Sequence, residues 1–248
     1  MKLIKIAILG VMLGLGFFNA SFAAEKTIGV FVALADNEHQ GLVPVPKKLG
    51  NGLDPDNNLY WGSADGLKTI FDKSKYWTLL EKSENDSSHA VLRTRVYQSK
   101  QYPAKLIAKA YNGAYMQQAI SDFEQALAHD EYDLVVFIGH NGLMDFNLNL
   151  PDQTTTSETN KNPAAMVLAC QSKQYFKSRI ESLGGKPTLL TTQFMYPGAF
   201  ILRDAVNDWL KGKDSNTIRA SAGRAYAHNQ NISVRAATGI FANLAEVK

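Results

Sequence analysis

The chain has 248 residues, of which 45% are hydrophobic and 20% are charged, and its formal net charge is +3. This composition excludes a disordered chain, a collagen-like repeat and a coiled coil, and so small a charge argues against nucleic acid as a partner. A chain of this length buries a large core without disulfides, and its one cysteine, Cys170, excludes an intramolecular disulfide.

Residues 1–23 have the three-part pattern of a cleaved signal peptide. Two lysines precede the apolar segment 6–18, and the small residues Ser21 and Ala23 stand at the −3 and −1 positions of a signal-peptidase site. A membrane anchor is the alternative, but 13 apolar residues are short for a span. We therefore expect a single mature domain, residues 24–248, that is periplasmic or secreted and has no membrane anchor after cleavage.

Apolar runs and helical periodicity alternate along the mature chain. Continuous apolar runs such as 27–34 are typical of strands buried on both faces, and apolar residues at helical spacing, as in 116–127, predict amphipathic helices. In chain order we expect strands at 27–34, 76–80 and 91–97, a helix at 116–127, strands at 134–138 and 164–169, a helix at 172–183, a strand at 188–192, and helices at 201–210, 216–228 and 234–244.

Strands that alternate with helices predict right-handed crossovers and an α/β fold, a three-layer αβα sandwich around a largely parallel sheet. Two long connections, 36–61 and 141–163, leave from the carboxyl ends of predicted strands. Loops of this length in a compact domain are usually functional or mobile, and open α/β sheets build their sites at this edge.

His140 comes two residues after the predicted strand that ends at Ile138, and Cys170 comes directly after the predicted strand that ends at Ala169. If the two strands are parallel neighbours, both side chains emerge at the same edge, where a histidine can serve a cysteine across a bound substrate. A helix that begins just after Cys170 would direct its N-terminal amides at the sulfur and favour the thiolate.

This arrangement resembles the caspase-like cysteine peptidases of clan CD, which include caspases, metacaspases, legumains, gingipains and clostripains. The resemblance is close over residues 132–172 and loose over 27–211, and it rests on an apolar strand before His140 and another before Cys170. It implies a caspase-like fold with Cys170 as the nucleophile, His140 as general acid or base, and the backbone N–H groups of Gly142 and Cys170 as oxyanion donors. It also implies a peptide or protein substrate, cleaved after acidic, basic or Asn residues, without a cofactor or catalytic metal.

Other polar residues near the same edge are weaker candidates for substrate binding. The cluster after the first strand suits a turn as well as a recognition loop, and the carboxylate shortly after His140 could orient that histidine or line a pocket. No spacing among the histidines, acidic residues and Cys170 matches a zinc pattern, so we expect no metal. The candidates are Asp36, Asn37, His39, Asn141, Asp145 and Gln193.

Exported proteins seldom keep an unpaired cysteine, so Cys170 is inert and buried, paired with another chain, or retained for its reactivity. The position of His140 favours reactivity and predicts an exported cysteine hydrolase, a peptidase. The alternative is a non-catalytic periplasmic domain on the same fold that binds a peptide or glycan under the 36–61 loop. A thiol-dependent sensor is a third, weaker interpretation.

Overall fold

The computed structural model describes residues 24–151 and 161–244 of the chain. The signal peptide expected at 1–23 and part of the 141–163 connection, residues 152–160, lie outside the described residues. Within the described part, no helix has both the length and the apolar character needed to cross a membrane.

The described residues form an α/β fold around one seven-stranded sheet in the order β2-β3-β4-β1-β5-β6-β7. Strands β1, β4, β5, β6 and β7 pair in parallel, whereas β3 is antiparallel to both β2 and β4. The strands are β1 (Lys26–Ala33), β2 (Trp77–Glu84), β3 (Val91–Ser99), β4 (Ala104–Tyr111), β5 (Leu134–Ile138), β6 (Ala164–Leu168) and β7 (Lys186–Leu189).

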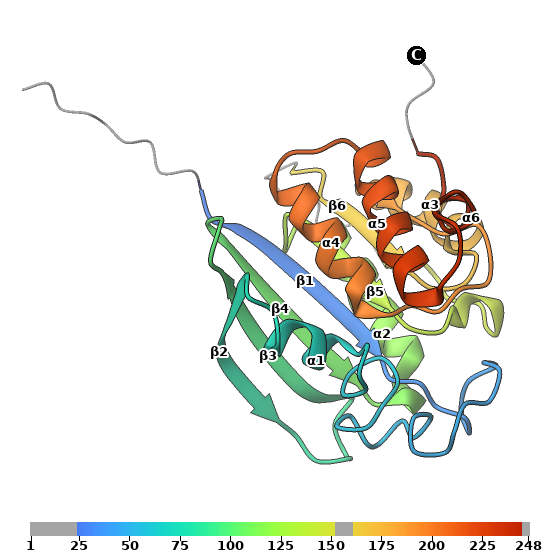
Figure 1. The fold of residues 1–248 in the computed structure, drawn as a ribbon. Coiled ribbons are helices and arrows are strands. Elements are labelled where there is room, and N and C mark those ends of the chain that lie inside the picture. The colour runs from blue at the N-terminus through green and yellow to red at the C-terminus, as the bar shows by residue number, and fades with distance from the viewer. Residues whose placement is uncertain (1–23, 152–160, 245–248) are drawn as a thin grey trace, which may run out of the picture.

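Helices cover both faces of the sheet (Figure 1). On one face, α1, α4, α5 and α6 contribute to one hydrophobic core, and α2 and α3 contribute to a second core on the other face. Their bounds are α1 (Leu67–Asp72), α2 (Met116–Ala128), α3 (Ser172–Ser182), α4 (Ala199–Leu210), α5 (Ser215–Gln230) and α6 (Val234–Ile240), with the short 3-10 helices η1 (Gly113–Tyr115) and η2 (Gly142–Met144).

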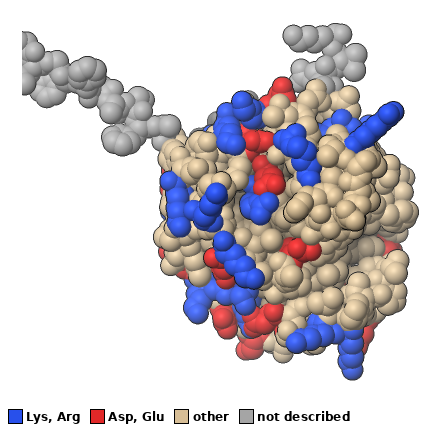
Figure 2. Space-filling view, viewed as in Figure 1, with Lys and Arg blue, Asp and Glu red and all other residues tan. Residues whose placement is uncertain are grey.

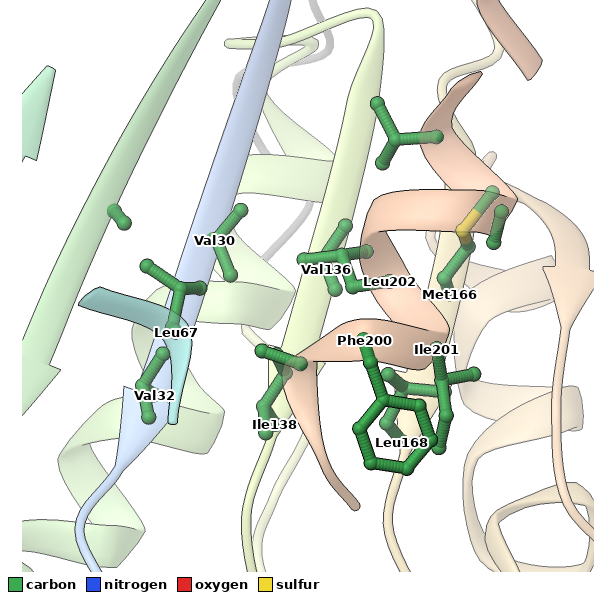
Figure 3. Packing of buried hydrophobic residues seen from close by; sticks show 14 of the residues in the cluster. Val30, Val32, Leu67, Val136, Ile138, Met166, Leu168, Phe200, Ile201 and Leu202 are labelled. Atoms are coloured by element: carbon green, nitrogen blue, oxygen red, sulfur yellow. The ribbon is translucent and has the colours of Figure 1, made fainter. Parts of the chain in front are cut away.

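The first core explains why the central strands are apolar throughout. Figure 3 shows alternate side chains of β1, β5 and β6 on one face of the sheet, with Val32 of β1 beside Leu67 of α1, and with Val136 of β5 and Leu168 of β6 beside Leu202 and Phe200 of α4. The intervening side chains of the same strands pack on the opposite face against α2 and α3. Full burial of one such side chain contributes roughly 1.5–3 kcal/mol, so the two cores together hold the strand ends in place.

Two elements were not expected from the sequence, β4 and α1. Strand β4 does alternate buried and partly exposed residues, but its buried positions include three alanines and its outer positions include Lys105 and Lys109, which weakens the apolar signal. Helix α1 has six residues, too few for helical periodicity to emerge. The strand expected at 188–192 ends at Leu189, because Thr191 instead bridges to Phe241, and the last helix ends at Ile240 rather than 244.

The face seen in Figure 2 mixes basic and acidic side chains without a large region of one sign. This mixture agrees with the small net charge and with the ion pairs distributed over the surface, among them Lys68 with Asp56 and Lys211 with Asp208.

A buried ion pair joins the two helices of the second face. Glu124 on α2 is 1% exposed and accepts two hydrogen bonds from Arg179 on α3, at 2.5 Å from Nε and 2.7 Å from Nη2. A bidentate pair of this kind fixes the position of α3, the helix that follows Cys170.

Replacing Arg179 by methionine is expected to lower the free energy of unfolding by about 3–5 kcal/mol, because a buried carboxylate is left without its partner. Urea denaturation of a protein of residues 24–248 measures the loss. The matched control is Lys177→Met on the same helix, which removes an exposed pair with Glu181 and should cost less than about 1 kcal/mol. Equal losses in the two variants would contradict the structural role of the Glu124 pair.

Candidate active site

The ends of β5 and β6 bring His140 and Cys170 to one cavity. Ile138 and Leu168 are paired in the parallel register, and each of the two candidate residues follows two positions later. Gly139 has a φ of 157° and its N–H bonds to the carbonyl of Leu168 at 3.3 Å, which keeps the two strand ends together past the last paired residues. His140 and Cys170 both line a cavity of about 460 Å³ at this end of the sheet.

An aspartate orients the imidazole of His140. The ring is largely buried, and its Nε2 atom lies 2.8 Å from Oδ2 of Asp145. Asp145 follows His140 by five residues, and the turn through η2 brings its carboxylate back to the ring. An ionised carboxylate only accepts hydrogen bonds, so Nε2 carries the proton and Nδ1 is the basic nitrogen. Within the described ranges Nδ1 has no hydrogen-bond partner.

The long 36–61 loop completes this His–Asp pair. The backbone N–H of Gly41 donates to Oδ2 of Asp145 at 3.0 Å. A Cβ at position 41 would clash with the carboxylate, so the close approach requires glycine. Gln40 anchors the adjacent chain through its side-chain amide, which donates to the carbonyls of Leu34 at 2.7 Å and Gly113 at 3.0 Å.

Cys170 lies in a tight turn between β6 and α3. The following residue, Gln171, has a φ of 50°, in the left-handed region that non-glycine residues seldom adopt. The Cys170 sulfur contacts the backbone of Met195, accepting its N–H at 3.4 Å and facing its carbonyl at 3.6 Å. The sulfur is half-buried, forms no hydrogen bond to His140, and shares the cavity with it.

The first amides of α3 do not donate to the sulfur, contrary to the sequence-based expectation. The Ser172 N–H donates to Oγ1 of Thr191 at 3.0 Å, and the Lys173 N–H donates to the backbone carbonyl of Thr191 at 2.9 Å. Ser172 Oγ in turn donates to the carbonyl of Val167 at 2.9 Å, and Thr191 Oγ1 donates to that of Ala169. This buried network of hydrogen bonds joins the start of α3 to the end of β6 and so stabilises the Cys170 turn.

The two predicted oxyanion donors differ in availability. The Gly142 N–H donates to the carbonyl of His140 at 3.1 Å, in a tight turn around Asn141, and is therefore occupied in this structure. The Cys170 N–H has no hydrogen-bond acceptor among residues 24–151 and 161–244. Of the two groups, only the amide of Cys170 is free to bind a substrate oxygen.

Asn141 links the two strand ends instead of facing the cavity. Its side chain is fully buried, and Nδ2 donates to the carbonyl of Cys170 at 2.7 Å. The residue is absent from the lining of the cavity that holds His140 and Cys170. This bond fixes the His140 turn to the Cys170 turn.

The predicted cluster after the first strand lines a separate cavity of about 280 Å³. There, Asp36 is buried and bonds to Nδ1 of His39 at 2.9 Å. Asn37 lines the same cavity and bonds through its side-chain amide to both backbone groups of Val45, which closes the loop on itself. These residues are thus not in the cavity of Cys170.

Gln193 is exposed and lies outside the lining of the Cys170 cavity, although its carbonyl accepts the N–H of Gln171 at 3.0 Å. The residues that follow it, Phe194 to Pro197, do line the cavity. Tyr60 lines the same cavity from the long loop. Burial, together with the nearby Cys170, raises the pKa of the Tyr60 phenol well above its usual value, which keeps it neutral.

No group of three or more His, Cys, Asp or Glu side chains in the described part of the chain is arranged to hold a metal ion. In comparisons with protein-family models, with curated proteins and with solved structures, the chain matches none of them. The function is therefore argued from the cavity itself.

Proposed function

We propose that this chain is an exported, caspase-like cysteine hydrolase, a peptidase that uses Cys170, His140 and Asp145. The observation that carries the proposal is one cavity that holds a cysteine and a histidine from neighbouring strand ends, with the histidine already oriented by a carboxylate. A nucleophile, a proton carrier and an orienting group are the three parts that acyl transfer requires. The export pattern of residues 1–23 supports a periplasmic or secreted site of action.

In the proposed reaction the substrate carbonyl lies between the two side chains. The sulfur of Cys170 bonds to the carbonyl carbon, and the thiol proton moves to Nδ1 of His140, whose resulting positive charge Asp145 stabilises. The Cys170 N–H binds the oxyanion. When the carbon–nitrogen bond breaks, His140 transfers the proton to the leaving amine, and water then cleaves the thioester to release the acid and restore the thiol.

Alkylation of the thiol tests this proposal. At pH 7 we expect iodoacetamide to modify Cys170 about tenfold faster than it modifies glutathione, and His140→Ala to remove that advantage, because the thiolate rather than the thiol reacts. Intact mass measured over time gives both rates.

The control variant is His89→Ala, which removes an exposed histidine that pairs with an aspartate and does not line the cavity, and it should leave the rate unchanged. A Cys170 that reacts more slowly than glutathione, at a rate independent of His140, would instead support the non-catalytic binding domain.

A further inference from the structure

The wall of the Cys170 cavity is apolar on two sides. The 36–61 loop contributes Leu42, Val43 and Leu59, and the segment after β7 contributes Phe194, Met195 and Pro197. Because these residues flank the proposed nucleophile, a side chain next to the scissile bond would lie against them.

No charged side chain of the lining is free to pair with a charged substrate. Among the described residues, no lysine, arginine or glutamate lines the cavity, and the one aspartate of this lining, Asp145, already binds His140 and the N–H of Gly41. The hydroxyls of Tyr60 and Tyr196 stay neutral, since burial raises the pKa of both phenols well above the usual value. A charged substrate side chain would lose its hydration here without gaining a counter-ion.

Two large apolar side chains stand exposed at the rim of the cavity. Val43 is 85% exposed and Phe194 is 70% exposed, and they come from two different segments of the lining, the 36–61 loop and the segment after β7. Apolar surface that is left open on both sides of a site is typical of a ligand-binding groove, since a bound apolar group removes it from water.

We infer that the residue that supplies the scissile carbonyl carries an uncharged apolar side chain of the size of Leu, Met or Phe. This inference rests on the proposed function and narrows it. It departs from the resemblance noted in the sequence, which implies cleavage after acidic, basic or Asn residues. The cavity of about 460 Å³ accommodates such a side chain together with the adjacent backbone.

Peptidyl acyloxymethyl ketones test the inference, because the thiol displaces their carboxylate and retains the peptide. Three probes of identical sequence would end in Leu, Lys or Asp, and intact mass would give the labelling rate of the mature protein, with Cys170→Ala to locate the adduct. We expect the Leu probe to react at least about tenfold faster than either charged probe.

Phe194→Glu then places a carboxylate on the exposed rim, where it should not disturb folding. The ratio of the Leu rate to the Lys rate is expected to fall about tenfold, through lost apolar contact and gained charge attraction. The control is Leu80→Glu, a half-exposed position on β2 outside the cavity lining, which should leave the ratio unchanged.

The outcomes separate this inference from the proposed function. Fastest labelling by the Lys or Asp probe, or an unchanged ratio in Phe194→Glu, would overturn the apolar specificity and leave Cys170 as a nucleophile. Failure of all three probes to modify Cys170 would overturn the hydrolase proposal and the specificity with it.

Discussion

Replacing Cys170 by alanine is expected to abolish peptide hydrolysis, with a fall in kcat of at least about 10⁴-fold, because no other described residue of the cavity lining carries a thiol or an aliphatic hydroxyl that could form the acyl intermediate. The sulfur contacts only the backbone of Met195 among its described hydrogen-bond partners, so its loss should cost no more than about 1 kcal/mol of stability. Cleavage of a mixed peptide library by a protein of residues 24–248 measures the activity, and thermal unfolding measures the fold.

The matched variant is Cys170→Ser, which keeps the size and hydrogen bonding of the side chain but supplies a much poorer nucleophile at neutral pH. We expect it to be folded and as inactive as the alanine variant. Undiminished cleavage by either variant would rule out a cysteine hydrolase. Peptide or glycan binding that persists in both, in a protein that never cleaves, would favour the ligand-binding alternative.

The part of this site that the sequence predicts depends on apolar runs. The runs at 134–138 and 164–169 are long enough to identify two buried parallel strands, and the positions of His140 and Cys170 just after these runs place both residues at one edge. A local pattern is sufficient here because the register of parallel strands, once formed, fixes where each chain leaves the sheet.

The rest of the site depends on contacts between segments far apart in the chain. The bond from Gly41 to Asp145 spans 104 residues, and the bond from Ser172 to Thr191 spans 19. Neither contact leaves a periodic signal, because each comes from an irregular loop or a strand end. The sequence likewise shows Asp36 and His39 close to the first strand, yet not that the fold of the loop gives them a cavity of their own.

Helix α3 illustrates how a correct element can carry a wrong expectation. Its start at Ser172 agrees with the sequence, and the general tendency of helix N-termini to favour anions predicted amides directed at the sulfur. The side chain and carbonyl of Thr191 occupy those amides instead. Which acceptor a helix N-terminal amide binds depends on the residues that the fold brings next to it, and the sequence alone does not show which residues these are.

Replacing Asp145 by asparagine is expected to lower kcat by about 10²–10⁴-fold and to change KM little. The neutral amide removes the charge that stabilises protonated His140 and no longer fixes its proton on Nε2, while the apolar walls that hold the substrate remain. Steady-state kinetics on the preferred peptide give the two constants separately. A purely structural role would instead show as a loss of stability, which should be small because the Asp145 side chain is about one-third exposed.

The chain offers a close control in Asp86→Asn, which breaks a second aspartate–histidine pair, 3.1 Å long, on an exposed turn outside the cavity. We expect its kcat to equal that of the wild type, so a loss confined to Asp145→Asn would arise from the cavity and not from the general removal of a carboxylate. If Asp145→Asn also kept the wild-type kcat, the carboxylate would not assist His140 in catalysis. The catalytic residues would then be Cys170 and His140 alone.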